Sequence, residues 1–153
     1  LRAEDTIFID CGTTLIHLVD LLPESMPLTV VTYALNIADK LAQKPHIRLI
    51  VMGGFYHAAS ASFSGDTALA LLDQLGVNTA FLSAAGLDES RGATCIHFHE
   101  AEIKRKAMSV SAKNILIVDK SKLGRIRPAF FAKSGDFDAI YTEDGAWEAE
   151  DES

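Results

Sequence analysis

The sequence predicts an α/β fold, with a doubly wound, mostly parallel sheet and helices on both faces. Short runs such as TIFID, LTVVT and ILIVD are apolar nearly throughout, which is typical of parallel strands that are covered on both sides. These runs alternate with segments of helical apolar spacing, which implies crossover connections between parallel strands. The 153 residues, 48% of them hydrophobic, fit one domain of ordinary size.

The strands are predicted from apolar runs rich in β-branched residues. In chain order they fall at about residues 6–10, 28–32, 47–52, 79–84, 115–119 and 138–142. The helical patterns fill the intervals, near residues 13–22, 34–43, 65–75 and 99–112. The first helix follows a glycine, Gly12, and the third is preceded by Gly65 and ended by Gly76. No repeat or linker divides the chain.

Charge is unevenly spread along the chain. The net charge is −7, but six acidic residues and no basic residue follow Tyr141, so residues 1–142 are nearly neutral. We therefore expect one domain over residues 1–142 and a solvated, partly disordered acidic tail over residues 143–153. No basic face of the kind that contacts DNA directly stands out.

The apolar runs, the cysteines and the start of the chain indicate where the protein works and whether the chain is a whole protein. No apolar run is long enough to span a membrane. The only cysteines, Cys11 and Cys95, have no paired spacing, which favours a reducing cytoplasm and buried thiols. Because the first strand follows Leu1 almost at once, the chain is expected to be a piece of a longer protein.

The loop DCGTT at residues 10–14 has the parts of a phosphate cradle. Ligands of such sheets bind outside the carboxyl ends of the strands, where this loop lies. Gly12 allows a tight turn, and Thr13 and Thr14 would offer hydroxyls and free N–H groups at the positive end of a helix. The spacing matches neither the dinucleotide fingerprint nor the P-loop, so no nucleotide cofactor is predicted. The alternative is an ordinary helix start without a ligand.

The segment HEAEIKRKAM at residues 99–108 is the second candidate. With a helical advance of 100° per residue, Glu100 and Lys104 border the apolar stripe of Ile103 and Ala107. They are therefore able to face a pocket, whereas Arg105 points to water. The alternative is a surface ion pair between Glu100 and Lys104.

Other polar loops are less specific. Of Lys120 and Lys122 in DKSKLG, at most one is expected to reach a ligand, and an exposed basic turn is equally compatible. Asp88 in GLDESRG is able to accept sugar hydroxyls or simply to form a turn. The histidines His97 and His99 lack further ligands at suitable spacing, so no metal site is predicted.

Seven phrases in order resemble the C-terminal effector domain of the DeoR family of bacterial sugar-metabolism repressors. The resemblance covers about residues 6–142 and is carried by IFIDCGTT, LTVVTYALNIA, IRLIVMGG, FSGDTALALLDQL, AFLSAAGLDESRGAT, HEAEIKRKAM and ILIVDKSKLG. It implies a fold similar to ribose-5-phosphate isomerase and an intracellular sensor for a phosphorylated sugar. Operator DNA would be bound by a helix-turn-helix domain that this chain does not contain.

The resemblance also implies two sides of a pocket. The phosphate side would consist of Asp10, Gly12, Thr13 and Thr14. The sugar side would consist of Gly86, Asp88, Glu100, Lys104 and Lys122, with Gly53 and Gly54 allowing close approach. Tyr33 stands where family members commonly have Asn, so its ring is expected to stack on the sugar or to narrow the pocket. The stretches GGFYHAAS, GATC and RPA favour deoxyribose 5-phosphate as effector.

Two further expectations concern assembly and activity. Ligand binding would shift the sensor domain between two arrangements, and this change would be transmitted to the DNA through the packing of subunits. A homo-oligomer is therefore expected. The segment PAFFAK at residues 128–133 is the candidate contact, and its alternative is an edge strand that packs on its own core. The rival to the sensor function is a sugar-phosphate isomerase that uses Asp88, Glu100 and Lys104 as acid, base and electrostatic partner.

Overall fold

The structure, a computed structural model, describes residues 1–148. In this part of the chain the main sheet has seven strands in the order β12-β11-β9-β6-β1-β2-β3. Their bounds are β1 (Thr6–Ile9), β2 (Leu28–Thr32), β3 (Ile47–Val51), β6 (Val77–Leu82), β9 (Ser111–Ile117), β11 (Ala139–Thr142) and β12 (Gly145–Ala146). Every neighbouring pair is parallel except β11 and β12. The predicted mostly parallel sheet is confirmed.

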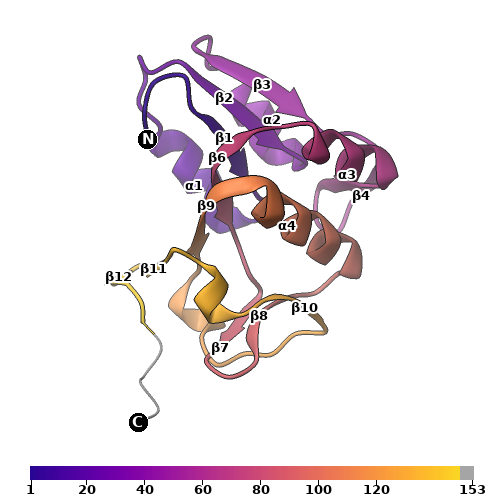
Figure 1. The fold of residues 1–153 in the computed structure, drawn as a ribbon, viewed down its shortest axis with the longest axis vertical. Helices are drawn as coiled ribbons and strands as arrows, with labels where there is room; N and C mark the ends of the chain where they lie inside the picture. The colour runs from indigo at the N-terminus through magenta and orange to yellow at the C-terminus, as the bar shows by residue number, and fades with distance from the viewer. Residues whose placement is uncertain (149–153) are drawn as a thin grey trace.

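The strand order reverses at β1, which lies between β2 and β6. Ile7 pairs with Val30 of β2 on one side and with Thr79 of β6 on the other. From β1 the chain builds outward through β2 and β3, and it then returns to β6 and builds the other half (Figure 1). Such a reversal leaves a crevice at the carboxyl ends of the two central strands, where ligands bind in folds of this kind.

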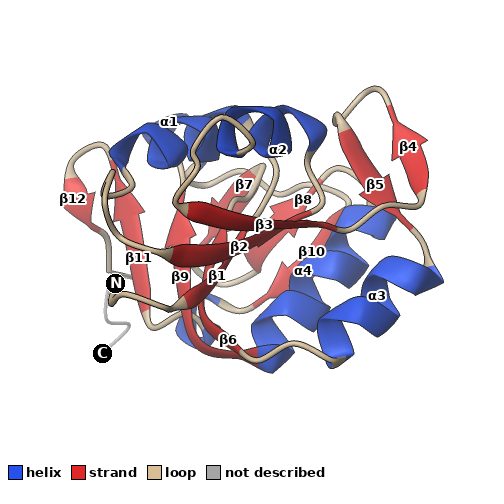
Figure 2. Ribbon diagram, turned by 90° about the horizontal axis from the view of Figure 1, so that it is seen from above, coloured by secondary structure: helices blue, strands red, loops and turns tan. Residues whose placement is uncertain are grey.

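Helices cover both faces of the main sheet, as predicted. Figure 2 shows α1 (Thr13–Leu21) and α2 (Leu35–Leu41) on one face, and α3 (Asp66–Asp73) and α4 (Phe98–Val110) on the other. Helix α1 turns Leu15 and Val19, four residues apart, onto the sheet. The central strand β1 is covered from both sides, and its residues Ile7, Phe8 and Ile9 are fully buried. Each contributes about 1.5–3 kcal/mol of hydrophobic stabilisation.

Two smaller sheets and two short helical turns were not predicted, apart from the edge strand considered as the alternative for residues 128–133. A hairpin joins β4 (Phe55–His57) to β5 (Ser62–Ser64), and a second sheet has the order β10-β8-β7. The bounds of the latter strands are β7 (Gly86–Asp88), β8 (Gly92–Cys95) and β10 (Ala129–Ala132), and the 3-10 turns are η1 (Lys120–Lys122) and η2 (Ser134–Asp136). Strands of only three or four residues carry too little alternation to be recognised.

The acidic end of the chain is partly joined to the main sheet. Strand β12 pairs with β11, and the backbone N–H of Trp147 donates to the carbonyl of Ile140 at 2.8 Å. Regular structure therefore continues beyond residue 142, where the sequence placed the start of a separate tail. The remainder of that predicted tail, residues 149–153, lies outside the described residues.

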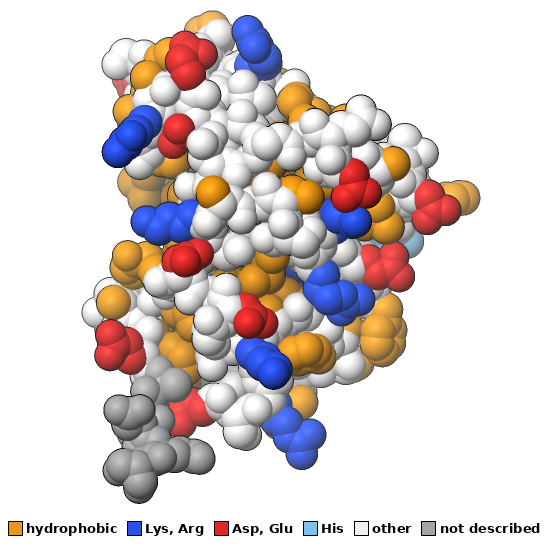
Figure 3. Space-filling view, viewed as in Figure 1, with side chains coloured by type: hydrophobic (Ala, Val, Ile, Leu, Met, Phe, Trp, Pro, Cys, Tyr) orange, Lys and Arg blue, Asp and Glu red, His pale blue; other side chains and the backbone are white. Residues whose placement is uncertain are grey.

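The surface mixes charges of both signs. On the face drawn in Figure 3, lysines and arginines are interspersed with aspartates and glutamates. Among the described residues, no helix is both long and apolar enough to cross a membrane.

Candidate functional site

A cavity of about 410 Å³ opens at the carboxyl ends of the central strands. Its walls come from the loops after β1, β6 and β9, the turn between β4 and β5, and the start of α4. It is lined by Cys11, Gly12, Thr13, Thr14, Asn36, Ala59, Ser60, Ala61, Ser83, Ala84, Ala85, Cys95, Ile96, His97, Glu100, Lys104, Asp119 and Lys122. A volume of this size is sufficient for a small metabolite.

One wall of the cavity is the start of α1. Gly12 precedes the helix with a φ of 116°, a value that side-chain-bearing residues rarely adopt, and a Cβ there would lie 3.3 Å from Ser83 Oγ. Thr13 and Thr14 form the first turn, and no side chain caps it. The first amides of a helix lack partners within the helix and carry partial positive charge. This wall therefore suits an anion.

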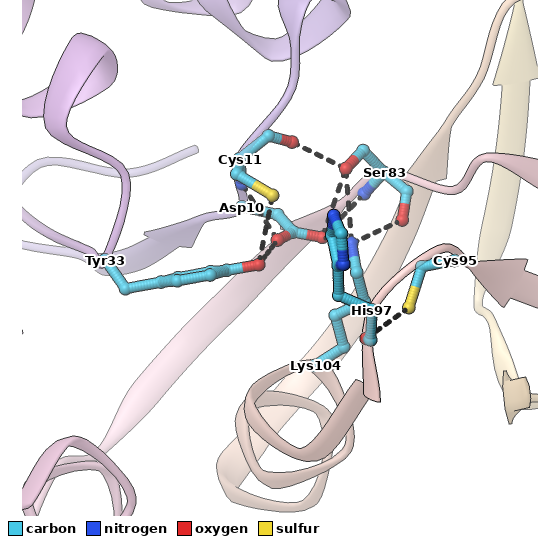
Figure 4. A network of polar contacts seen from close by, with 7 residues as sticks. All are labelled: Asp10, Cys11, Tyr33, Ser83, Cys95, His97 and Lys104. Atoms are coloured by element: carbon cyan, nitrogen blue, oxygen red, sulfur yellow. Dashed lines mark hydrogen bonds and ion pairs between the residues drawn. The ribbon is translucent and has the colours of Figure 1, made fainter. Parts of the chain in front are cut away.

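The floor of the cavity is a buried ion pair. The ammonium of Lys104, on α4, donates to Asp10 Oδ2 at the end of β1, and both side chains are almost wholly buried (Figure 4). Lys104 Nζ also donates to the carbonyl oxygen of Ser83 at 2.9 Å. Asp10 accepts the backbone N–H groups of Cys11 at 2.8 Å and of Ser83 at 3.0 Å. These bonds hold the lysine head at the base of the crevice.

Tyr33, which directly follows β2, also belongs to this network. Its hydroxyl donates to Asp10 Oδ1 and lies 3.2 Å from Cys11 Sγ (Figure 4). The side chain is fully buried, and its ring stacks on Phe8 with the ring centroids 5.9 Å apart. Tyr33 is not among the residues that line the cavity, so the expectation that its ring stacks on a sugar or narrows the pocket does not fit this placement.

Burial and neighbouring charges set the protonation states of the network. Burial disfavours the ammonium of Lys104, but the Asp10 carboxylate more than offsets it, so the pKa of Lys104 is raised. Burial raises the pKa of Tyr33, and the charge of Asp10 adds to the effect. Burial likewise raises the pKa of Cys95 to about 11. The lysine is therefore charged and the tyrosine and thiol are neutral at pH 7.

The opposite wall carries Glu100, whose carboxyl is largely buried. Burial raises its pKa, Lys104 opposes this shift, and Asp10 adds to it. No ion pair joins Glu100 to Lys104 in the described residues, since the lysine is paired with Asp10. Arg105 is exposed and donates to the carbonyl oxygen of Phe130 at 2.9 Å. The helical spacing therefore predicted correctly which residues of α4 face the cavity.

The rim combines a carboxylate, a lysine and a histidine stack. Thr14 Oγ1 donates to Asp119 Oδ2 at 3.4 Å, and Lys122 lines the cavity nearby on η1. His97 lines the cavity, and the ring of His99 stacks between the rings of His97 and His57, with centroids 5.2 and 3.7 Å away. In the described part of the chain, no three His, Cys, Asp or Glu side chains are grouped as metal ligands.

Half of the residues proposed from sequence line this cavity. They are Gly12, Thr13, Thr14, Glu100, Lys104 and Lys122. Asp10 is not among them. It lies at the base of the cavity, and its carboxylate already accepts hydrogen bonds from other groups of the protein. Gly53, Gly54, Gly86 and Asp88 lie elsewhere.

Three of these four positions have a local reason for their residue type, whereas a Cβ on Gly53 would meet no atom within 4 Å. A Cβ on Gly54 would lie 2.3 Å from the carbonyl oxygen of Ser64, and one on Gly86 would lie 2.4 Å from that of Arg125. These glycines therefore allow backbone to approach backbone. The carboxylate of Asp88 accepts the N–H of Arg91 at 2.8 Å, which lowers the pKa of Asp88 and closes a turn.

Sequence reasoning missed several polar residues of the cavity. Asn36, Ser60, Ser83, His97 and Asp119 all belong to it. Their position in the chain was the available signal, since Ser83 directly follows β6 and Asp119 is the second residue after β9. Short polar residues in such loops are otherwise common in turns, so their type alone did not distinguish them.

Comparisons with known proteins agree with this geometry. The family described as "DeoR C terminal sensor domain" matches residues 1–144. The deoxyribose operon repressor of Escherichia coli strain K12 is 38% identical over 143 residues, which are 94% of this chain and 57% of the repressor. The glycerol-3-phosphate regulon repressor of the same strain is 30% identical over 138 residues, covering 90% of this chain and 55% of that protein. The chain thus spans little more than half the length of these curated relatives.

A solved structure confirms the predicted fold class. Ribose 5-phosphate isomerase A from Methanocaldococcus jannaschii superposes with a TM-score of 0.55 at 16% sequence identity. The superposition covers 80% of this chain and 48% of the isomerase. At this identity the similarity concerns the fold.

Proposed function

This chain belongs to the DeoR C-terminal sensor domain family, and on that premise we propose that it binds a phosphorylated sugar and regulates transcription of genes for sugar or deoxynucleoside catabolism. The E. coli relatives are named as repressors of the deoxyribose operon and of the glycerol-3-phosphate regulon. Both names join a repressor to the use of a small polyhydroxylated compound. A domain that recognises such a compound would supply the signal.

The uncapped start of α1 is the observation that carries the proposal. It faces the cavity with Gly12, Thr13 and Thr14, and Lys122 lines the same cavity. Amide hydrogens, hydroxyls and one lysine match the needs of a phosphate group. We assign the phosphate to this wall.

The sugar would lie toward Glu100 and Lys104. Glu100 and His97 line the opposite side of the cavity and offer acceptors and donors for hydroxyl groups. Lys104 contributes its charge at the floor, although Asp10 and Ser83 already accept its hydrogen bonds. The similarity to the deoxyribose operon repressor favours deoxyribose 5-phosphate among the possible sugars.

The remaining partners follow from the same proposal. Operator DNA would be bound by a helix-turn-helix domain outside this chain, which requires the protein to work in the cytoplasm. A homo-oligomer would transmit the ligand signal, with β10 in the segment 128–133 as the contact. Phe130 of β10 is about half exposed, and Phe131 packs inward.

A sugar-phosphate isomerase is the alternative, favoured by the isomerase-like fold and by the raised pKa of Glu100, which suits a general base. Against it, Asp88 lies away from the cavity, and its carboxylate closes a turn. An assay with pentose phosphates separates the two functions. Turnover that is lost in Glu100→Gln would establish the enzyme in place of the sensor.

Calorimetric titration with sugars and their phosphates tests the proposed function directly. The phosphates should bind at least about ten-fold more tightly than the free sugars, because charge-assisted hydrogen bonds form only with the phosphate. Equal affinities would show that the start of α1 has no part in recognition.

A Gly12→Val variant tests whether the phosphate binds at the start of α1. Valine strains the backbone at a φ of 116° and crowds Ser83, so binding should be lost while the circular dichroism spectrum stays nearly unchanged. Gly76→Val is the matched control, because a Cβ at Gly76 would meet no atom within 4 Å. Unfolding of the Gly12 variant would instead indicate that this glycine serves the fold alone.

A further inference from the structure

The carboxylate of Asp119 lies at the wall that the phosphate is proposed to use. Asp119 directly precedes η1 and lines the cavity together with Thr13 and Thr14. Thr14 Oγ1 donates to Asp119 Oδ2 at 3.4 Å, a contact that joins residues 105 positions apart. An acidic side chain thus stands beside the positive end of α1, where negative charge is stabilised.

This contact and a bound phosphate are mutually exclusive at the hydroxyl. A threonine hydroxyl has a single proton, so Thr14 is able to donate either to Asp119 or to a phosphate oxygen. The two anions also repel each other at short range, and a dianionic phosphate doubles that repulsion. A phosphate that binds here must therefore displace the Asp119 carboxylate from Thr14.

We propose that Asp119 is an autoinhibitory residue that occupies the anion position at the start of α1, and so weakens anion binding there, until a phosphorylated ligand displaces it. The inference rests on the phosphate site proposed above. Inorganic phosphate or sulfate contacts only this position and bears the whole cost of displacement. A sugar phosphate also reaches Glu100 and His97 across the cavity, and those contacts offset the cost.

The turn that carries Asp119 is tied to the end of the chain. The backbone N–H of Lys120 donates to Glu143 Oε1 at 2.7 Å, and Lys120 Nζ lies 3.0 Å from Asp144 Oδ2. The displacement of Asp119 therefore acts on a segment that is hydrogen-bonded to the loop between β11 and β12. The same turn carries Lys122, so its movement can exchange a carboxylate for an ammonium beside the ligand.

The test is calorimetric titration of Asp119→Asn with inorganic sulfate and with deoxyribose 5-phosphate. Asparagine keeps the size of the side chain and removes its charge. Affinity for sulfate should rise by about ten-fold or more, since even a high-dielectric interaction of a dianion with a carboxylate about 5 Å away reaches this size. Affinity for deoxyribose 5-phosphate should rise as well.

Asp20→Asn is the matched control. It removes the same charge from α1, but at the other end of the helix, about 10 Å from its start, where Asp20 is exposed and paired with Lys40 at 2.9 Å. Its affinities should stay within about two-fold of those of the unaltered chain. Thermal unfolding of both variants checks that the fold is kept.

The outcomes separate this inference from the proposed function. If deoxyribose 5-phosphate binds the unaltered chain and Asp119→Asn binds it equally or less tightly, Asp119 is a neutral or contributing ligand contact and the inference is wrong. If no phosphorylated sugar from the panel and no sulfate binds either protein, the phosphate site itself is refuted, and the inference with it. A gain in Asp119→Asn that Asp20→Asn reproduces would indicate net charge and not the position of Asp119.

Discussion

Asp10 and Lys104 form a buried ion pair at the base of the cavity, although 94 positions separate them in the chain. The two side chains are 0% and 1% exposed. The pair joins the end of the central strand β1 to the middle of α4, and so fixes a helix against the strand end where the ligand is proposed to bind. Taking two charges out of water is costly, and each is tolerated only because the other is present.

Loss of one partner of this ion pair should therefore lower the free energy of unfolding by more than loss of both partners. Lys104→Met leaves the Asp10 carboxylate buried without its counter-charge and should lower the free energy of unfolding by about 3–5 kcal/mol. The double variant Asp10→Asn, Lys104→Met should recover a large part of this loss, because no uncompensated charge remains. Urea denaturation of the single and double variants measures the coupling, and additive losses would contradict it.

Tyr33 should stabilise the fold through its hydroxyl and not through contact with a ligand. Tyr33→Phe keeps the stack on Phe8 but removes a hydrogen bond to a buried carboxylate, so the free energy of unfolding should fall by about 1.5–3 kcal/mol. Tyr56→Phe is the control, because that side chain is about half exposed. Equal stability of the two variants in urea denaturation would assign no role to the Tyr33 hydroxyl.

The stability of the protein should respond to pH through Glu100. Burial raises the pKa of Glu100 in the folded state, so the folded state favours the protonated form. The stability contributed by this protonation is fully present below the unfolded pKa of about 4.3 and is lost as the pH rises through the higher folded value. Glu100→Gln should therefore be about 1 kcal/mol more stable than the unaltered chain at pH 7.5.

The same comparison at acid pH checks the sign. Below about pH 4 the Glu100→Gln variant and the unaltered chain should unfold at the same urea concentration, because Glu100 is then protonated in both states. Glu102→Gln, on the exposed side of α4, should show no such pH-dependent difference. A Glu100→Gln variant that is less stable at pH 7.5 would show that the ionised carboxylate has a stabilising partner.

The sequence predicted the structure best where the pattern of residue types is compatible with few local structures. The apolar runs predicted the parallel strands because only a sheet covered on both faces buries a run such as IFI completely. Helical spacing predicted that Glu100 and Lys104 face inward, because the direction of a side chain on a helix is fixed by its neighbours in the chain. Gly12 was singled out because a glycine between a strand and two threonines allows a tight turn at the carboxyl end of the strand, although an ordinary helix start has the same pattern.

The sequence was least informative where a residue depends on distant backbone. Gly54 was assigned to close approach of a ligand and Gly86 to the sugar side of the pocket, but they allow approach of the Ser64 and Arg125 carbonyls. Approach of a ligand and approach of another backbone segment both require a residue without a side chain, so the presence of glycine does not distinguish them. The partner of Lys104 was likewise hidden, because the contact with Asp10 exists only after the sheet and α4 have packed.

Lys122 and Lys120 should differ in their effect on ligand binding. Lys122 lines the cavity, whereas Lys120 Nζ pairs with Asp144 at 3.0 Å on an exposed surface. Lys122→Met should weaken binding of a sugar phosphate by about ten-fold, through loss of a positive charge beside the phosphate. Lys120→Met should change the affinity by less than about two-fold. Equal losses in calorimetric titration would mean that general charge, and not position, accounts for the effect.

Adjacent phenylalanines of β10 should separate assembly from stability. Strand β10 pairs only with β8 in the described sheet, and it turns Phe131 into the core and leaves Phe130 47% exposed. Phe131→Ala should lower the free energy of unfolding by about 3–5 kcal/mol, because it opens a cavity beside the Lys104 ammonium, which lies 5.1 Å from the ring centroid. Phe130→Arg should leave the urea midpoint nearly unchanged but lower the mass measured by light scattering, since a charge in an apolar contact between copies has no partner. If the mass of the Phe130 variant equals that of the unaltered chain at every concentration, β10 is an edge strand that serves only its own domain, and the contact between copies must lie on another surface.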